Sequence, residues 1–223
     1  MTHDAAPAFR RARSPEQQDV RRREILDAAE RLLGEAGVAE ISLREIGRAV
    51  GCANSNILRY FGTREGVFLA LLDREWAQWL ERLERELPPS GTDVPVPVLA
   101  DVLADSIAGR PELCKLMSAL GSLLREGAPP PVMTTFRAQA VTRNLEAARL
   151  LADRVPGLET AAASEFVVLA SAYLAGWWPL ASPPGAVEDT PTAPHKPTPP
   201  RNFRDGLARG LAVLLTGLLS DHS

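Results

Sequence analysis

The chain has 223 residues, of which 45% are hydrophobic and 24% charged, so it is long and apolar enough to bury a core without disulfide bonds or a structural metal. Its net charge of −3 gives no sign of a polyanionic partner until the charge is divided along the chain. Two distant cysteines, Cys52 and Cys114, exclude a disulfide framework and a CxxC metal site, and a reducing cytoplasm is expected.

The basic residues gather near the N-terminus. Residues 1–64 hold 11 of the 25 basic residues and 9 of the 28 acidic ones, which leaves this part at +2 and the remainder at −5. Six arginines fall between residues 9 and 23, at Arg10, Arg11, Arg13, Arg21, Arg22 and Arg23. A basic arm over residues 1–20 suggests a polyanionic partner, although a solvated, disordered tail is the alternative.

Three short helices are predicted over residues 21–66. Apolar residues recur with helical spacing from Ile25 to Ala36, and Gly37 is a natural C-terminal cap. Ser42 and Glu45 form the S-x-x-E capping box of a second helix, which Gly51 ends. A third helix is expected from Ala53 or Asn54 to Gly62.

Longer helices are predicted for residues 67–223. Thr63 caps a helix that ends before Pro88, and further helices are expected over 96–108, from Pro111 to about Glu126, after the triple proline at 129–131, over 158–181 and from about Asn202. Residues 182–200 contain seven prolines and are expected to be a loop. No apolar run alternates convincingly enough for a strand, so the fold class is all-α with about nine helices.

The second and third helices, with the glycine-containing turn between them, match a helix-turn-helix, whose second helix enters the major groove. Short polar side chains at the start of the third helix suit base edges, and Asn54, Ser55 and Asn56 supply them. Phosphate contacts are expected from Arg59, Tyr60 and Arg64. Arg44 can donate two parallel bonds to guanine.

The run from Arg22 to Leu72, RREILDAAERLLGEAGVAEISLREIGRAVGCANSNILRYFGTREGVFLALL, resembles the N-terminal DNA-binding domain of the TetR family of bacterial transcriptional regulators. The resemblance implies base or phosphate contacts from Arg44, Asn54, Ser55 and Asn56, and phosphate contacts from Ser42, Tyr60 and Arg64. Arg22 lies at the start of the first helix and is a further candidate for DNA contact. The family usually has tyrosine where this chain has Leu58, which can meet a thymine methyl or belong to the core.

The resemblance also implies a larger helical domain for ligand binding and dimerisation. Plausible residues lining a pocket for a small, largely apolar effector are Trp76, Cys114, Met117, Met133, Phe136, Tyr173 and Trp177. Each of them could instead be ordinary core. The last two helices are expected to form a four-helix bundle with their copies in a second subunit, through Phe166, Leu169, Tyr173, Leu207, Leu211, Leu214 and Leu218. An intramolecular core is the alternative.

These patterns predict a homodimeric transcriptional regulator that binds a palindromic operator in double-stranded DNA, with a ligand-released repressor as the hypothesis. The alternatives are an activator, or a small-molecule binding or sequestering protein whose helix-turn-helix is vestigial. His3, His195 and His222 lie outside the expected core, so neither catalysis nor a cofactor is predicted. No apolar run is long enough for a membrane helix, and a cytoplasmic protein is expected.

Overall fold

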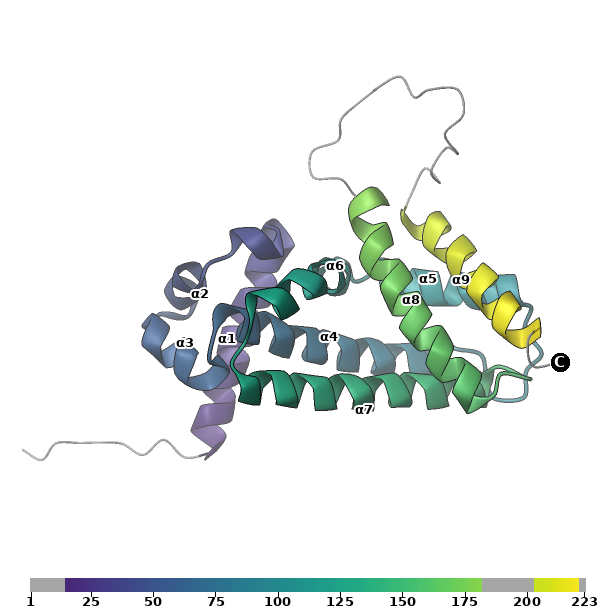
Figure 1. Cartoon of the computed structure of the whole chain (residues 1–223), viewed down its shortest axis with the longest axis horizontal. Coiled ribbons are helices and arrows are strands. Elements are labelled where there is room, and N and C mark those ends of the chain that lie inside the picture. The colour runs from purple at the N-terminus through teal and green to yellow at the C-terminus, as the bar shows by residue number, and fades with distance from the viewer. Residues whose placement is uncertain (1–14, 182–202, 221–223) are drawn as a thin grey trace, which may run out of the picture.

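The computed structural model describes residues 15–181 and 203–220, and these fold into nine α-helices and one 3-10 turn without a strand (Figure 1). The predicted all-α class is thereby confirmed. No helix in the described part of the chain is long and apolar enough to cross a membrane. The elements are α1 Pro15–Glu35, η1 Val38–Glu40, α2 Leu43–Val50, α3 Asn54–Phe61, α4 Arg64–Glu86, α5 Val96–Ala108, α6 Pro111–Glu126, α7 Pro130–Arg154, α8 Thr160–Ala181 and α9 Phe203–Ser220.

The helix-turn-helix of α2 and α3 is fixed by its caps. The backbone N–H of Ser42 donates to Glu45 Oε2 at 2.7 Å, and the backbone N–H of Glu45 donates to Ser42 Oγ at 3.3 Å. This reciprocal pair is the predicted capping box, which satisfies two amides at the start of α2. Gly51 ends α2 with a φ of +64°, a conformation that glycine adopts at little cost.

The turn between α2 and α3 passes close to α2 at Gly47. A Cβ at this position would lie 2.8 Å from the carbonyl oxygen of Cys52 and 3.0 Å from Asn54 Oδ1. The backbone of the turn therefore occupies the space that a side chain would need. This close approach sets the angle at which α3 leaves α2.

Gly47→Ala is expected to lower the free energy of unfolding by about 1–3 kcal/mol, because the turn must move away from α2 to admit the methyl group. Urea denaturation followed by circular dichroism measures the change. Gly121→Ala is the matched control, since a Cβ there meets only the end of the Arg125 side chain, 3.8 Å away. It is expected to stabilise the protein slightly, as alanine does in an open helical position. Equal destabilisation by both changes would contradict this account.

The first helix begins earlier than the sequence indicated. Residues 15–20, expected as part of the N-terminal arm, form the first turns of α1, with Pro15 at a position that suits the start of a helix. Hydrophobic periodicity did not predict these turns, because the stripe of buried apolar residues begins only at Ile25. Val20 lies before the stripe and is 46% exposed. Residues 1–14 and the expected loop over 182–200 lie outside the described residues.

Helix α4 connects the helix-turn-helix to the rest of the molecule (Figure 1). Thr63 caps it as predicted, with its Oγ1 accepting from the backbone N–H of Gly66 at 3.1 Å. Phe68, Leu71 and Leu83 are fully buried along its length. One hydrophobic core continues from Ile25 in α1 to Leu218 in α9, so the two parts of the chain are packed against each other.

Helices α8 and α9 are held together by two aromatic rings on two glycines. Tyr173 and Trp177 stack with their ring centroids 5.9 Å apart, and Cβ atoms at Gly206 and Gly210 would overlap these rings. The hydroxyl of Tyr173 donates to the Gly206 carbonyl at 2.9 Å, and Trp177 Nε1 donates to the Phe203 carbonyl at 3.1 Å. Both side chains therefore join α8 to α9 rather than line a pocket.

Candidate nucleic-acid interface and internal cavities

The outer face of α3 is polar and accessible. Asn54, Ser55 and Arg59 are exposed and Asn56 is half-buried. The opposite face carries Ile57 and Phe61, which are 0% and 2% exposed and anchor the helix in the core. The structure thus presents the polar residues predicted for base contacts on one short, well-anchored helix.

Leu58 lies on the same accessible surface of α3. Its exposed fraction is 41%, so it does not belong to the core. Of the two interpretations that the sequence left open, the structure therefore excludes the core. A leucine in this position offers an apolar surface among polar neighbours, as suits a thymine methyl.

Helix α2 adds basic side chains beside α3. Arg44 is exposed, as is Arg48 one turn later, and the spacing of four residues puts both on one helical face. The sequence reasoning missed Arg48, although this spacing could have found it. Ser42 is exposed, and its hydroxyl also contacts Glu45 Oε2 at 2.7 Å, so it is engaged in the cap of α2.

At the end of α3, Arg59 and Tyr60 form a pair. Arg59 Nη2 donates to the Tyr60 hydroxyl at 2.9 Å, and the guanidinium lies 4.9 Å from the centre of the Tyr60 ring. Arg59 is exposed and Tyr60 is half-buried. The contact holds the cation at the surface of the helix-turn-helix unit, where a phosphate could meet it.

The structure corrects the role expected for Arg64. Its guanidinium points inward, where it donates to the carbonyls of Ile41, at 2.6 Å, and Val38, and it lies over the Phe68 ring. It also pairs with Glu65 at 3.1 Å. These donors satisfy carbonyl groups around η1, so Arg64 joins η1 to α4 and is withdrawn from the expected phosphate contacts.

Arg22 is likewise used inside the subunit. Its Nη1 donates to the Tyr60 carbonyl at 3.1 Å, and its guanidinium lies 4.5 Å from the centre of the Phe61 ring. Burial lowers the pKa of this guanidinium, and the nearby carboxylates of Asp19 and Asp73 oppose the effect. Arg22 therefore connects α1 to the end of α3, and the structure does not present it as a free DNA contact.

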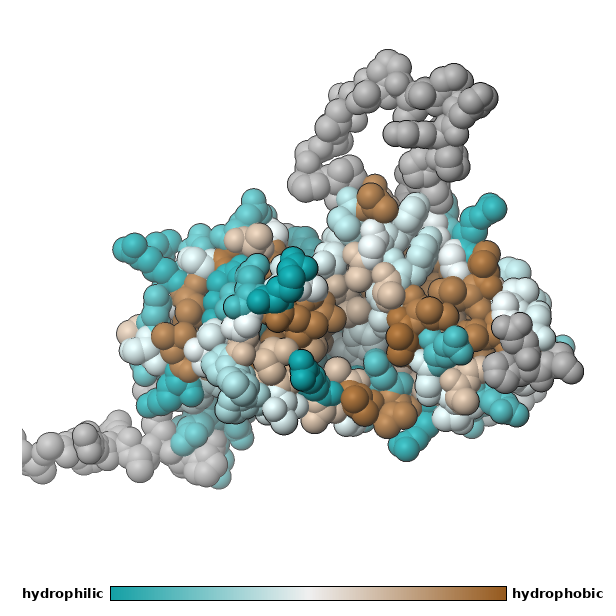
Figure 2. All heavy atoms as spheres, viewed as in Figure 1, coloured by the Kyte–Doolittle hydropathy of each residue, from teal (hydrophilic) through white to brown (hydrophobic). Residues whose placement is uncertain are grey.

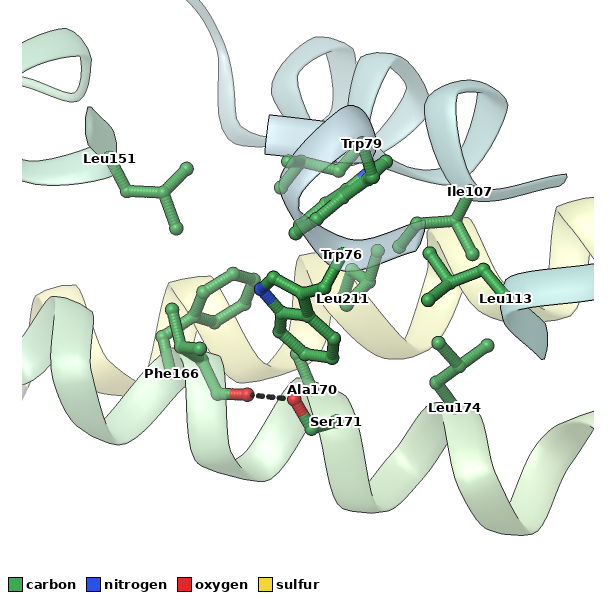
Figure 3. A pocket seen from close by; sticks show the side chains of 12 residues that line it. Trp76, Trp79, Ile107, Leu113, Leu151, Phe166, Ala170, Ser171, Leu174 and Leu211 are labelled. Carbon is green, nitrogen blue, oxygen red and sulfur yellow. Dashed lines mark hydrogen bonds between the residues drawn. The ribbon is translucent and has the colours of Figure 1, made fainter. Parts of the chain in front are cut away.

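Two of the cavities between the helices of the larger domain have wall residues in common. The apolar cavity, of about 40 Å³, is enclosed by α4 to α9 and lined by Trp76, Trp79, Leu103, Ile107, Leu113, Leu151, Phe166, Val167, Ala170, Ser171, Leu174 and Leu211 (Figure 3). The mixed cavity, of about 110 Å³, lies between α4, α6, α7 and α8 and is lined by Leu72, Asp73, Trp76, Met117, Leu120, Phe136, Ala140, Arg143, Asn144 and Ser171. Trp76 and Ser171 line both.

Three of the residues predicted for a pocket line these cavities, namely Trp76, Met117 and Phe136. Cys114 is fully buried, and burial raises the pKa of its thiol to about 12, so it is an inert core residue. Met133 is half-buried against the core without lining either cavity. Most of the lining residues that the sequence reasoning missed are aliphatic, and an aliphatic side chain carries no signal that distinguishes a cavity wall from core. The others include Trp79 and the polar residues Asp73, Arg143, Asn144 and Ser171.

The indole of Trp76 differs from that of Trp79 in its hydrogen bonding. It meets Trp79 edge to face, with ring centroids 5.5 Å apart. Trp79 Nε1 donates to Ser106 Oγ at 3.0 Å. Trp76 Nε1 is buried and has no hydrogen-bond partner among the described residues. An unpaired buried donor costs about 1–3 kcal/mol, so this group has free energy to gain from an acceptor.

Most residues predicted for the dimer interface lie inside the subunit. Phe166, Leu207, Leu211 and Leu218 are at most 7% exposed, and Phe166 and Leu211 line the apolar cavity. The leucine stripe of α9 packs against α5 and α8 of the same chain. The alternative of an intramolecular core is therefore correct for these four residues. Leu214 and Tyr173 are half-buried, and Leu169 is 38% exposed.

A different face of α8 is apolar and uncovered. Val168, Ala172, Gly176 and Leu180 follow one another at intervals of four residues, and all are exposed. Leu169 broadens this row, which we call the α8 stripe. Val168 and Leu180 are 56% and 74% exposed. Figure 2 shows hydrophobic groups gathered over α8 and α9. A contiguous row of exposed apolar residues is a candidate interaction site.

A polar junction connects the larger domain to α1. Arg74 of α4 pairs with Asp27 and Glu30 of α1, each at 2.6 Å. Arg110, just before α6, pairs with the buried Glu75 at 2.9 Å. Burial raises the pKa of Glu30; Glu75 adds to this effect and Arg74 opposes it. The junction places several charges where α1, α4 and α6 meet.

Lys115 of α6 joins the same junction at the end of α1. Its ammonium group donates to the carbonyls of Leu33 and, at 3.3 Å, Ala36. In a continuing helix the Gly37 amide would donate to the Leu33 carbonyl. It donates to Glu40 Oε2 at 2.6 Å, which leaves the Leu33 carbonyl available to Lys115. A cation at a helix C-terminus is favourable in addition to its hydrogen bonds. Helix α6 therefore contacts the end of α1 through Lys115, and other residues of α6 line both cavities.

No group of three or more His, Cys, Asp or Glu side chains within the described ranges could hold a metal ion. The three histidines of the sequence lie outside those ranges.

Comparison with known proteins supports the division into two parts. Residues 25–71 match the family described as "Bacterial regulatory proteins, tetR family", and residues 73–222 match "Tetracyclin repressor-like, C-terminal domain". An uncharacterised HTH-type transcriptional regulator of Mycobacterium tuberculosis is 31% identical over 172 residues, which cover 65% of this chain and 82% of that protein.

Solved structures show the same fold. A TetR-family transcriptional regulator from Streptomyces coelicolor matches 91% of this chain and 83% of its own, with a TM-score of 0.55 and 17% identity. A TetR regulator from Rhodococcus sp. RHA1 matches 92% of this chain and 99% of its own, with a TM-score of 0.53 and 16% identity. At these identities the similarity concerns the arrangement of the helices.

Proposed function

Because the chain belongs to the TetR family of bacterial transcriptional regulators, we propose that it binds a palindromic DNA operator as a homodimer and is released by a small ligand. The observation that carries the proposal is the exposed polar face of α3, which buried Ile57 and Phe61 hold in place beside the capped α2. Such a protein acts in the cytoplasm, and it represses where its operator overlaps a promoter.

In this proposal the base contacts come from Arg44, Asn54, Ser55 and Asn56, with Leu58 meeting a thymine methyl. Arg48 and the Arg59–Tyr60 pair contact phosphates, together with Ser42 where its cap allows. Arg22 and Arg64 act indirectly, because they fix α1, η1 and α4 around the helix-turn-helix. Rigid support of this kind keeps α3 in the orientation that base contacts require.

Selection of bound duplexes from a random pool, followed by mobility-shift titration, tests the proposal. We expect a palindromic consensus with half-sites separated by one helical turn or a multiple of it, and an affinity that falls steeply with salt. A protein that selects no consensus, and binds random DNA no better than any acidic protein, would favour the ligand-sequestering alternative.

Dimerisation in this proposal uses the α8 stripe. A row of residues four apart forms a ridge that can pack against a second helix, and Ala172 and Gly176 allow close approach at its centre. A twofold axis through this region pairs the stripe with its own copy. Homodimers are typical of the family, and the exposed apolar row supports the proposal that the contact is made through α8.

Release by a ligand requires a physical connection between the cavities and α3. Leu113 lines the apolar cavity, Met117 lines the mixed cavity, and Lys115 between them holds the end of α1. We infer that a ligand entering the larger domain displaces α6, and that Lys115 carries the displacement to α1. The ligand would thereby favour a subunit arrangement whose half-site spacing no longer fits the operator.

Lys115→Met is expected to loosen the end of α1, because methionine keeps the apolar stem but cannot donate to the two carbonyls. Amide hydrogen exchange in the last turn of α1 and in η1 should accelerate about tenfold, the equivalent of roughly 1.4 kcal/mol. Lys115→Arg retains a donor and a positive charge and serves as the control. Unchanged exchange in the methionine variant would show that α6 does not restrain α1 through this side chain.

A further inference from the structure

Trp76 separates the two cavities of the larger domain. Trp76 forms part of the wall of both, and Ser171 is the only other residue that their walls share. Figure 3 shows these two side chains in the wall of the apolar cavity. Because they share these two wall residues, the cavities adjoin each other, and a ligand that displaces the Trp76 ring would join them. Their combined size would then be comparable with the cavity of about 150 Å³ that holds a benzene-sized molecule. The space therefore suits a compact ligand about the size of one substituted ring.

Among the buried indole and hydroxyl groups around this space in the described part of the chain, one hydrogen-bond donor has no acceptor. Trp79 and Trp177 each donate their indole N–H to an oxygen, and the hydroxyl of Ser171 donates to the Val167 carbonyl at 2.6 Å. Trp76 Nε1 has no such acceptor in the described part of the chain. Since an indole nitrogen can only donate, a ligand satisfies it with a hydrogen-bond acceptor.

The charges around this space favour an uncharged ligand. The apolar cavity has no charged side chain in its walls. In the mixed cavity, Arg143 Nε pairs with Asp73 Oδ1 at 3.0 Å, so the two charges of that wall compensate each other. An ionised ligand would lose its hydration without gaining a free counter-charge.

We propose that the ligand is a compact, uncharged and mostly apolar molecule with an acceptor oxygen, and that this oxygen takes the N–H of Trp76 while the apolar part fills the joined cavity. This inference deepens the proposed function and rests on it, because the ligand is that of the proposed regulator. Aryl ketones, esters and aldehydes of single-ring size belong to this chemical class. Alkylbenzenes lack the acceptor, and benzoates carry a charge.

Calorimetric titration of the full chain with acetophenone, cumene and benzoate tests the proposal, because the three share a ring and the same number of non-hydrogen atoms. Acetophenone is expected to bind about fivefold or more tightly than cumene, the ratio that one net hydrogen bond of about 1 kcal/mol provides. Benzoate is expected not to bind measurably. Equal affinities for acetophenone and cumene, or tighter binding of benzoate, would overturn the proposal.

Trp76→Phe removes the N–H while keeping an aromatic ring, so it should abolish the preference for acetophenone over cumene. Trp178→Phe is the matched control, because the Trp178 ring packs edge to face on Phe203, with centroids 4.8 Å apart, and lines neither cavity. That variant should keep the preference. A Trp76→Phe protein that still prefers the ketone would assign the acceptor contact to another group and overturn the inference.

Nuclear magnetic resonance gives an answer that does not depend on how the variants fold. The chain has four tryptophans, and acetophenone should move one indole N–H resonance downfield while cumene leaves that proton without an acceptor.

Operator binding without ligand is measured on the same preparation. A protein that binds its operator but none of the probes contradicts the ligand class alone, whereas a protein that selects no operator contradicts the proposed function.

Discussion

A variant with Arg44 and Asn54 both replaced by alanine is expected to lose sequence-specific DNA binding while keeping its fold. Both side chains are exposed, Arg44 on α2 and Asn54 at the start of α3, so their removal leaves no cavity. A good paired contact to a base contributes about 1–3 kcal/mol of discrimination. Since a dimer makes each contact twice, even about 1 kcal/mol per contact lowers operator affinity roughly a thousandfold.

The measurement is a mobility-shift titration with the operator selected by the unmodified protein, beside a shuffled duplex of the same length. Affinity for the shuffled duplex should fall much less, because binding to random DNA depends mainly on phosphate contacts. Arg149→Ala removes an exposed arginine near the C-terminal end of α7, outside the helix-turn-helix, and should change neither affinity. If the double variant binds the operator as tightly as the unmodified protein, these two residues do not read the sequence.

The helix-turn-helix could be predicted from the sequence because its signals are local. Ser42 and Glu45 form their capping box three residues apart, and Gly51 ends α2 through its own backbone conformation. Ile57 and Phe61 are four residues apart, which puts them on the same face of α3, and this face is buried in the core. Each of these signals needs only its neighbours in the chain, so one sequence is enough to recognise them.

The roles of Arg22 and Arg64 could not be predicted in the same way. Their acceptors are the carbonyls of residues 23 to 38 positions away, at Ile41, Val38 and Tyr60. Whether such a carbonyl lacks a partner depends on where η1 and the end of α3 finish in space. An arginine near a DNA-binding helix therefore looks the same in the sequence whether it faces a phosphate or the interior of the protein.

The residues predicted for the dimer interface show what an apolar pattern cannot predict. Periodicity indicates which face of α9 is buried, and Leu207, Leu211 and Leu218 are indeed buried. It does not indicate which element covers that face, and α5 and α8 of the same subunit do so. The nearly apolar composition of α8 was the more informative signal, because one face enters the core and the α8 stripe remains exposed.

Val168→Asp is expected to convert the proposed dimer into a folded monomer. The side chain is 56% exposed in the subunit, so an aspartate there is solvated and leaves the fold intact. In the proposed dimer the α8 stripe is covered, and each carboxylate would lose its water without gaining a partner, at a cost of more than about 3 kcal/mol. Twofold symmetry applies this cost twice, which weakens association by roughly 10⁴-fold.

Analytical ultracentrifugation across a range of protein concentrations measures the change. Val141→Asp is the matched control, since Val141 is 59% exposed on α7, outside the α8 stripe, and its substitution introduces the same charge. The control should remain dimeric with the thermal stability of the unmodified protein. Two dimeric variants would place the interface elsewhere, and a monomeric unmodified protein at micromolar concentration would remove the dimer from the proposal.

Operator binding by the monomeric variant separates the contribution of α3 from that of symmetry. A monomer keeps Arg44, Asn54 and Leu58 on an unchanged helix-turn-helix, so it should still prefer an operator half-site over a shuffled one. It should lose most of its affinity for the full palindrome, because two linked half-sites bind more tightly than either does alone. A variant that recognises half-sites but no longer distinguishes their spacing would show that base contacts come from α3 while spacing comes from the α8 stripe.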